Sequence, residues 1–157
     1  MKKEEILIRN AYQEEWTEVI GLVWKVFMEF EADDYEEEGI ESFRSFITDN
    51  TLYRMFQTGS YQVMVAVYHQ KIIGMIGLRS NIHISLLFVE PAYHRNGIGR
   101  SLIQFASHYL LSEFGADRLT VNASPYGLAF YERMGFQPTG VETTCEGIRY
   151  TPMIFYL

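Results

Sequence analysis

The chain has 157 residues, of which 48% are hydrophobic and 15% aromatic, and its 13 basic and 20 acidic residues leave a formal net charge of −7. This length suits one domain, which we expect to span residues 1–157, and the apolar content excludes a disordered chain. The apolar runs are far shorter than the ~20 residues of a membrane helix, so we expect a soluble protein without a membrane partner. The negative charge argues against a nucleic-acid partner.

Two further features favour a cytoplasmic location. Residues 2–9 read KKEEILIR, so the chain begins with charges and lacks the long apolar stretch of a secretory signal. Cys145 is the only cysteine. It therefore excludes an internal disulfide and a cysteine-based zinc site, and we expect no metal.

The first half of the chain is predicted to contain one strand and two helices. A short β-like run covers residues 5–9. Apolar residues then recur at steps of three and four between about residues 13 and 30, which predicts an amphipathic helix. The same spacing over residues 40–47 predicts a second, shorter helix, and residues 52–56 give no clear signal.

The second half alternates between strands and helices. A hairpin is predicted from residues 61–68 and 72–78, and a third strand from residues 82–89, which Pro91 ends. Residues 97–115 have a helical period; a strand at 118–121, a helix at 127–134 and a final hairpin at 136–157 follow. The order β-α-α-β-β-β-α-β-α-β-β predicts an α/β (α+β) fold with helices packed on a mixed sheet.

The segment from residue 87 to residue 101, LFVEPAYHRNGIGRS, carries the most chemical information. A strand ends, a loop carries Arg95, and Gly97-Ile98-Gly99 opens a helix whose unpaired first-turn amides and dipole favour an anion such as a pyrophosphate. The segment lacks the Gly-Lys-Ser/Thr of a Walker loop and the third glycine of a dinucleotide fingerprint. Glycines at a helix start can also serve packing alone.

The pattern P-x-Y-x-R-x-G-I-G-x-x-L after a strand, followed by Val121-Asn122 and by AFYERMGF at residues 129–136, resembles the GNAT superfamily of acetyl-CoA-dependent N-acetyltransferases. The resemblance covers most of the chain, and its specific part spans about residues 72–136. It implies the GNAT-like acyl-CoA N-acyltransferase fold, with acetyl-CoA as cosubstrate. The family usually has Gln or Arg where this sequence has His94.

The resemblance also implies cofactor-binding residues. The strand backbone at Leu87, Phe88 and Val89 would pair with the pantetheine arm of coenzyme A. Asn122 would lie where the next strand splays away to admit that arm, although it could equally be an ordinary strand-end cap. The pyrophosphate would be held by His94, Arg95, Asn96, Gly97, Ile98, Gly99, Arg100 and Ser101.

Tyr131 and His83 are the predicted catalytic residues. Tyr131 resembles the family's general acid beside the coenzyme A sulfur, or else it is a core tyrosine. His83 falls where some family members carry a catalytic glutamate, and strand alternation places it on the face opposite Ile82, Ile84 and Leu86. A structural role for His83 stays open, as do Glu90, the acidic segment and a water relay as the base.

Eight of the twenty acidic residues lie between residues 29 and 41, without any Lys or Arg. They form either a solvated surface or an electrostatic lure for a cationic molecule. The family's loop between the first two helices often walls the acceptor site, which makes Glu31, Asp33 and Asp34 the predicted substrate-binding residues. Carboxylates there would attract an ammonium group but would also raise its pKa and oppose its deprotonation.

The function these observations favour is transfer of an acetyl group from acetyl-CoA to a primary amine of a small cationic molecule, by direct attack on the thioester. A polyamine, an aminoglycoside-like compound or an amino-acid derivative would fit. The alternatives are acetylation of a protein N-terminus or lysine, and an acyl-CoA-binding module without turnover. A homodimer could form through an edge strand near the C-terminus.

Overall fold

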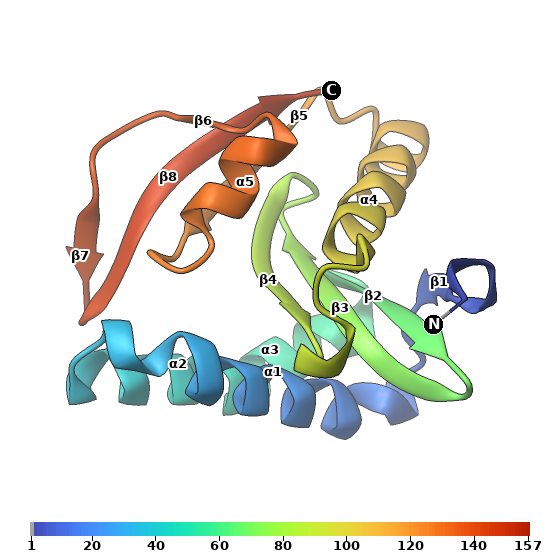
Figure 1. The fold of residues 1–157 in the computed structure, drawn as a ribbon, viewed down its shortest axis with the longest axis horizontal. Coiled ribbons are helices and arrows are strands. Elements are labelled where there is room, and N and C mark those ends of the chain that lie inside the picture. The colour runs from blue at the N-terminus through green and yellow to red at the C-terminus, as the bar shows by residue number, and fades with distance from the viewer. Residues whose placement is uncertain (1) are drawn as a thin grey trace.

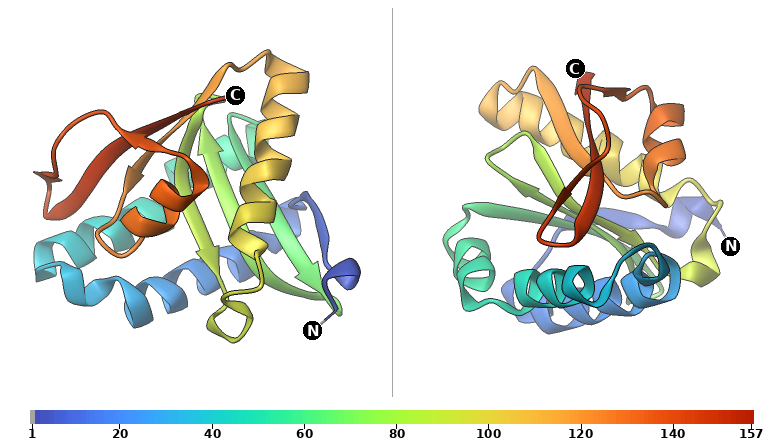
Figure 2. Two further views of the ribbon diagram at one scale, coloured as in Figure 1. Left: turned by 45° about the horizontal axis from the view of Figure 1, so that its top comes forward. Right: turned by 90° about the vertical axis from the view of Figure 1, so that its left-hand side faces the viewer.

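The computed structural model describes residues 2–157 and shows one mixed sheet between two layers of helices (Figures 1 and 2). The strands are β1 (Leu7–Asn10), β2 (Tyr61–Tyr68), β3 (Lys71–Arg79), β4 (His83–Val89), β5 (Arg118–Ala123), β6 (Gln137–Pro138), β7 (Thr143–Cys145) and β8 (Ile148–Tyr156). The helices are α1 (Trp16–Phe30), α2 (Glu37–Thr48), α3 (Asn50–Thr58), α4 (Ile98–Phe114) and α5 (Leu128–Met134). The sheet order is β1-β2-β3-β4-β5-β8-β6, with β7 paired to β8.

The predicted fold class is confirmed, and the structure adds two elements to the predicted order. Residues 52–56 lie in α3, which the Asp49 carboxylate caps by accepting a hydrogen bond from the Thr51 amide at 2.9 Å. Gly59 ends that helix with a left-handed φ of 85°. The C-terminal region forms three strands, because the short β6 and β7 both pair with β8.

Each face of the sheet has its own apolar core. Helices α1, α2 and α3 cover one face, where Val23, Phe27 and Met75 are buried. Helices α4 and α5 cover the other face, where Leu102 and Ile76 are buried. Burying a side chain of this size contributes about 1.5–3 kcal/mol. The sheet is therefore held from both sides, and the strand ends that carry the candidate site have fixed positions.

A β-bulge in β4 changes which way its side chains point. Gly77 pairs with Leu86 and Leu78 pairs with Ile84, so Ser85 has no partner on β3. Ile84 consequently packs in the core beneath α4, whereas Leu86 packs in the core beneath α1. The prediction that His83 lies opposite Ile84 is consistent with this arrangement, but the prediction that it lies opposite Leu86 is wrong, because the extra residue interrupts the alternation.

Strands β4 and β5 separate soon after they meet. They are the one parallel pair among the described strands, and only His83 with Thr120 and Ile84 with Val121 are paired. From Asn122 onward β5 pairs with β8 alone. One edge of β4 therefore lacks a strand partner from Ser85 to Val89, and α5 follows β5 on the same side of the molecule (Figure 1).

The cytoplasmic location and the homodimer stay predictions. No helix within residues 2–157 is long and apolar enough to cross a membrane. Strand β8 is flanked by β5 and by the short β6 and β7, which leaves those two short strands at that border of the sheet. Dimerisation through a C-terminal edge would therefore have to use them.

The bulge generates a prediction for stability. A Cβ added at Gly77 would overlap the Tyr61 hydroxyl, which is buried and lies 2.6 Å from the Oγ of the bulged Ser85. We expect Gly77→Ala to lower the free energy of unfolding by about 1–3 kcal/mol, measured by urea denaturation. Gly21→Ala is the control: Gly21 is exposed on α1 with open space around it, so this change should raise stability by up to ~1 kcal/mol. Equal effects of the two changes would contradict the packing argument.

Candidate active site

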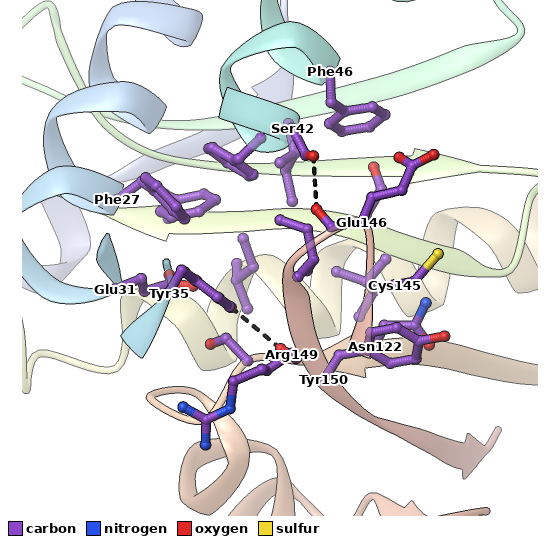
Figure 3. A pocket seen from close by; sticks show the side chains of 18 of the residues that line it. Phe27, Glu31, Tyr35, Ser42, Phe46, Asn122, Cys145, Glu146, Arg149 and Tyr150 are labelled. Carbon is purple, nitrogen blue, oxygen red and sulfur yellow. Dashed lines mark hydrogen bonds between the residues drawn. The ribbon is translucent and has the colours of Figure 1, made fainter. Parts of the chain in front are cut away.

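Two neighbouring cavities lie where β4 and β5 separate. The first, which we term the α5 cavity, has a volume of about 420 Å³ and lies between the end of β4, the turn before α4, and α5. The second, the hairpin cavity, has a volume of about 290 Å³ and lies between β4, α1, α2 and the β7–β8 hairpin (Figure 3). Both are lined by Glu31, Leu87, Phe88 and Ser124.

The turn into α4 presents unpaired amides. Arg95 and Gly97 have left-handed φ values of 66° and 74°, and no side chain caps the helix. Within the described chain, no hydrogen bond uses the amides of residues 95–100. The Asn96 side chain holds the turn by donating to the carbonyls of Tyr93 and His94 at 3.1 and 3.0 Å. Together with the helix dipole, these unpaired amides are available to an anion, and their arrangement fits the predicted pyrophosphate site.

The two glycines of the turn serve different purposes. A Cβ at Gly97 would meet nothing within 4 Å, so this residue is needed for its positive φ. A Cβ at Gly99 would lie 3.1 Å from the Phe130 ring, so this residue lets α5 pack closely on α4. The packing alternative for the Gly-x-Gly motif therefore applies to Gly99.

The free edge of β4 faces the α5 cavity. The Glu90 amide donates to the Ile73 carbonyl at 2.7 Å, so the alternation of an antiparallel ladder directs the peptide groups of Val89 away from β3. The Val89 carbonyl accepts a hydrogen bond from His94 Nε2 at 2.7 Å. Because a carbonyl oxygen only accepts, Nε2 must carry the ring proton. His94 thus covers part of the strand edge, which is a role the sequence did not indicate.

The structure brings most predicted cofactor-binding residues together. The wall of the α5 cavity includes Leu87, Phe88, Val89, His94, Arg95, Ile98, Gly99 and Tyr131. Asn96 and Gly97 in the same turn, and Arg100 and Ser101 at the start of α4, do not line the cavity. Asn122 is exposed, follows the last β4–β5 pair, and lines the hairpin cavity instead.

Tyr131 is buried on α5, with 7% of its surface exposed. Its ring packs edge-on against Phe130 and Phe136. The described residues give its hydroxyl no hydrogen-bond partner. Burial, and secondarily the charge of Glu31, raises the pKa of this phenol above its ordinary value. Tyr131 is therefore a protonated donor on the wall of the α5 cavity.

His83 is half-buried in the hairpin cavity. Its Nδ1 lies 2.8 Å from the Thr120 hydroxyl. Burial, and secondarily the charge of Arg79, lowers the pKa of His83 to about 4. The imidazole is neutral at physiological pH, but with this pKa it is a weak proton acceptor.

Glu31 is the residue at the C-terminal end of α1, and it lines both cavities. Burial is the main cause that raises the pKa of Glu31 to about 7; the Ser124 hydroxyl opposes this shift and Asp34 adds to it. A carboxylate with this pKa is about three units more basic than His83. It can therefore gain and lose a proton near neutral pH.

Glu31 lines the two cavities, whereas Asp33, Asp34 and residues 36–38 of the same acidic segment do not. Asp33 is exposed, and the backbone carbonyl of Asp34 accepts a hydrogen bond from Arg149 at 3.0 Å. Neither residue lines a cavity. Residues 36–38 are exposed at the start of α2, where acidic side chains interact favourably with the helix dipole. Glu90 is buried, pairs with Lys25, and lies on neither cavity wall.

The β7–β8 hairpin supplies cavity residues that the sequence analysis missed. Its turn docks on α2, where Gly39 and Gly147 approach so closely that neither position has room for a Cβ. Ser42 Oγ donates to the Glu146 carbonyl at 2.7 Å, and the Tyr35 hydroxyl donates to the Arg149 carbonyl at 3.3 Å (Figure 3). The hairpin residues on the cavity wall are Cys145, Glu146, Ile148, Arg149 and Tyr150. The Glu146-Gly147 turn was a visible signal, but nothing local indicated that it packs on α2.

A fold with a splayed β4–β5 pair and an anion-binding turn is typical of acyl-CoA-dependent transferases, and comparisons with known proteins agree. The sequence model described as "Acetyltransferase (GNAT) domain" matches residues 31–157. The chain therefore belongs to the GNAT acetyltransferase family, whose members use acetyl-CoA.

Two solved structures and one protein sequence illustrate the similarity. The uncharacterized N-acetyltransferase YafP of Escherichia coli is 35% identical over 91 residues, which cover 57% of this chain and 56% of that protein. This chain thus spans about half the length of that relative. A GCN5-related N-acetyltransferase from Rhodopseudomonas palustris has 25% identity and a TM-score of 0.83, and covers 100% of this chain and 99% of its own. The PaiA N-acetyltransferase of Thermoplasma acidophilum, in complex with coenzyme A, shares the fold with 21% identity, a TM-score of 0.79, and 97% and 99% coverage.

The raised pKa of Glu31 generates a prediction for stability. Folding favours the protonated carboxyl, so the folded protein loses stability as the pH rises from about 4.5 through 7. At pH 8 we expect the free energy of unfolding of Glu31→Gln, measured by urea denaturation, to exceed that of the wild type by about 2 kcal/mol. At pH 4 the two proteins should have nearly the same free energy of unfolding. Glu36→Gln, at an exposed position, is the control. A pH-independent difference for Glu31→Gln would contradict the assignment.

Proposed function

We propose that the protein transfers an acetyl group from acetyl-CoA to the primary amine of a small cationic molecule by direct attack on the thioester. One observation carries this proposal. The α5 cavity is lined by Arg95, Ile98 and Gly99 of the segment with unpaired amides and by Tyr131, and it shares Glu31 with the hairpin cavity. This arrangement supports an anion site, a proton donor and a carboxylate around one cavity, with the neighbouring hairpin cavity for the acceptor.

The residues of the α5 cavity fit coenzyme A in the order that the molecule requires. The amides of residues 95–100 would hold the pyrophosphate, and Arg95 would add a positive charge beside it. The free edge of β4 would pair with the pantetheine arm, as an added strand does. Acetyl-CoA supplies an activated thioester, and Tyr131 would donate a proton to the departing sulfur.

The acceptor amine has to lose a proton before it can attack. With a pKa of ~10.4, about one alkyl amine in a thousand is neutral near pH 7, a deficit of roughly 4 kcal/mol. The candidate acceptors for this proton are His83, in the hairpin cavity, and Glu31, between the two cavities.

The hairpin cavity favours a small acceptor. The cavity has a volume of about 290 Å³, and the β7–β8 hairpin, which is docked on α2, forms one of its walls. A protein segment would need a wider approach, so this wall supports a small molecule over a protein acceptor. Asp33 and residues 36–38 lie outside the cavity, so they could attract a cation only at long range. Glu31, on the cavity wall, would bind an ammonium group directly.

Replacing Gly97 tests coenzyme A binding. Gly97→Val places a branched side chain in the open space beside the unpaired amides, so we expect the Kd for acetyl-CoA to rise at least tenfold, or about 1.4 kcal/mol. Gly115→Val is a matched control, because Gly115 at the other end of α4 has a similar φ of 64° and open space around it. Calorimetric titration of both variants checks this, and equal affinities would contradict the pyrophosphate site.

Replacing Tyr131 tests turnover. Tyr131→Phe keeps the ring packing but removes the donor, so we expect kcat to fall about 100-fold with little change in the KM for acetyl-CoA. Release of the coenzyme A thiol with a panel of amines measures this. Tyr109→Phe, on α4 and outside both cavities, is the control. Undiminished turnover would remove Tyr131 from the mechanism, and a wild type that binds acetyl-CoA without turnover would favour the binding-module alternative.

A further inference from the structure

The end of α1 holds Glu31 in a defined place between the two cavities. The Glu31 amide donates to the Phe27 carbonyl at 2.8 Å, which continues the helix to this residue. The ring of the preceding Phe30 packs against the rings of His94 and Tyr126, with centroid distances of 5.1 Å to His94 and 5.5 Å to Tyr126. Both of these neighbours line the α5 cavity. The contacts therefore tie the end of α1 to the cavity in which we place coenzyme A.

Glu31 is also the only titratable residue among those that line both cavities. The other three are Leu87, Phe88 and Ser124, none of which can accept a proton from an ammonium group. With the thioester placed in the α5 cavity and the amine in the hairpin cavity, the reacting atoms would lie beside the residues that line both cavities.

We infer that the Glu31 carboxylate accepts the proton of the acceptor ammonium and is thus a catalytic residue, an inference that rests on the proposed function. The ammonium gives one proton to Glu31, and the neutral nitrogen then forms a bond to the thioester carbon. The carbon–sulfur bond breaks, and the sulfur keeps the electron pair and takes the Tyr131 proton. The nitrogen then gives a second proton to the Tyr131 phenolate, which restores the phenol. Glu31 releases the proton that it took from the ammonium group to water, so the products are an amide, a thiol and one proton.

The surroundings of Glu31 suit this role better than those of His83. The titratable groups whose charges interact with Glu31 are Asp34 and Tyr35 in the segment that follows it and Tyr131 on α5; Arg149 on β8 and His94 before α4 line the hairpin cavity and the α5 cavity, respectively. Among residues 2–157, none of these groups forms an ion pair with the Glu31 carboxylate. His83, in contrast, lies in the hairpin cavity alone and has one ring nitrogen beside the Thr120 hydroxyl.

The assignment also removes a conflict in the lure hypothesis. A permanently ionised carboxylate beside an ammonium group would raise the pKa of the amine and oppose attack. A carboxylate that titrates near neutral pH can bind the ammonium and then take its proton, so binding and activation use the same group.

The pH dependence of kcat/KM tests the inference, with thiol release as the assay. Wild type needs an ionised Glu31 and an ammonium substrate, so its rate should rise through about pH 7 and level off before pH 10. Glu31→Gln should lower kcat about 100-fold and lose the rise near pH 7, so that its rate follows the neutral amine up to about pH 10. Glu31→Asp should recover part of kcat and keep a rise at lower pH. The Kd for acetyl-CoA should change less than twofold in both variants.

Two further variants separate this inference from its alternatives. Glu146→Gln removes the other acid of the hairpin cavity, and His83→Gln removes the imidazole. Both should keep the rise near pH 7, whatever their effect on the KM of the amine. If the rise persists in Glu31→Gln or disappears in His83→Gln, the inference is wrong while the acetyltransferase function stands. If the wild type binds acetyl-CoA but acetylates no amine, both the inference and the proposed function fail.

Discussion

The early separation of β4 and β5 is the constraint on which the rest of the site depends. Two residue pairs join these parallel strands, and beyond them β5 turns to β8. An unpaired strand edge within a sheet leaves peptide groups that must find another partner. Here the edge opens into a cavity, and the unpaired amides at the start of α4 lie at the end of the same cavity. The proposed strand addition thus depends on the missing strand partner of β4, and the proposed anion site depends on the uncapped start of α4.

The side chains around this opening come from segments that are distant in the sequence. The bulge at Ser85 turns Leu86 toward α1, and the packing of Phe30 brings the end of α1 against the turn at His94. Arg149 on β8 donates to the carbonyl of Asp34, which joins the C-terminal hairpin to the segment after α1. The hairpin cavity is therefore an assembly of three separate parts of the chain, and its shape depends on how each of them packs.

The burial of Glu31 affects both the stability of the fold and the pKa of its carboxyl group. Burial of its carboxylate raises the pKa and costs folding free energy at neutral pH, because the charged form is poorly solvated. The same burial gives the carboxylate a pKa at which it can exchange a proton near pH 7. A charge that weakens the fold thus lies on the wall of both cavities, which is the arrangement expected of a functional residue.

Elements with strong periodicity, such as α1 and α4, and the turn at residues 95–100 could be predicted from the sequence, because helical spacing, glycine and proline act locally. The sequence also pointed to Tyr131 and to the β4 edge through a family pattern. It could not show the bulge, which reverses the face of Leu86, or the docking of Gly147 on Gly39. Only the tertiary structure decided that Glu31 reaches the cavities while Asp33 does not, since burial and long-range packing, rather than the spacing of acids along the chain, select which carboxylate faces the site.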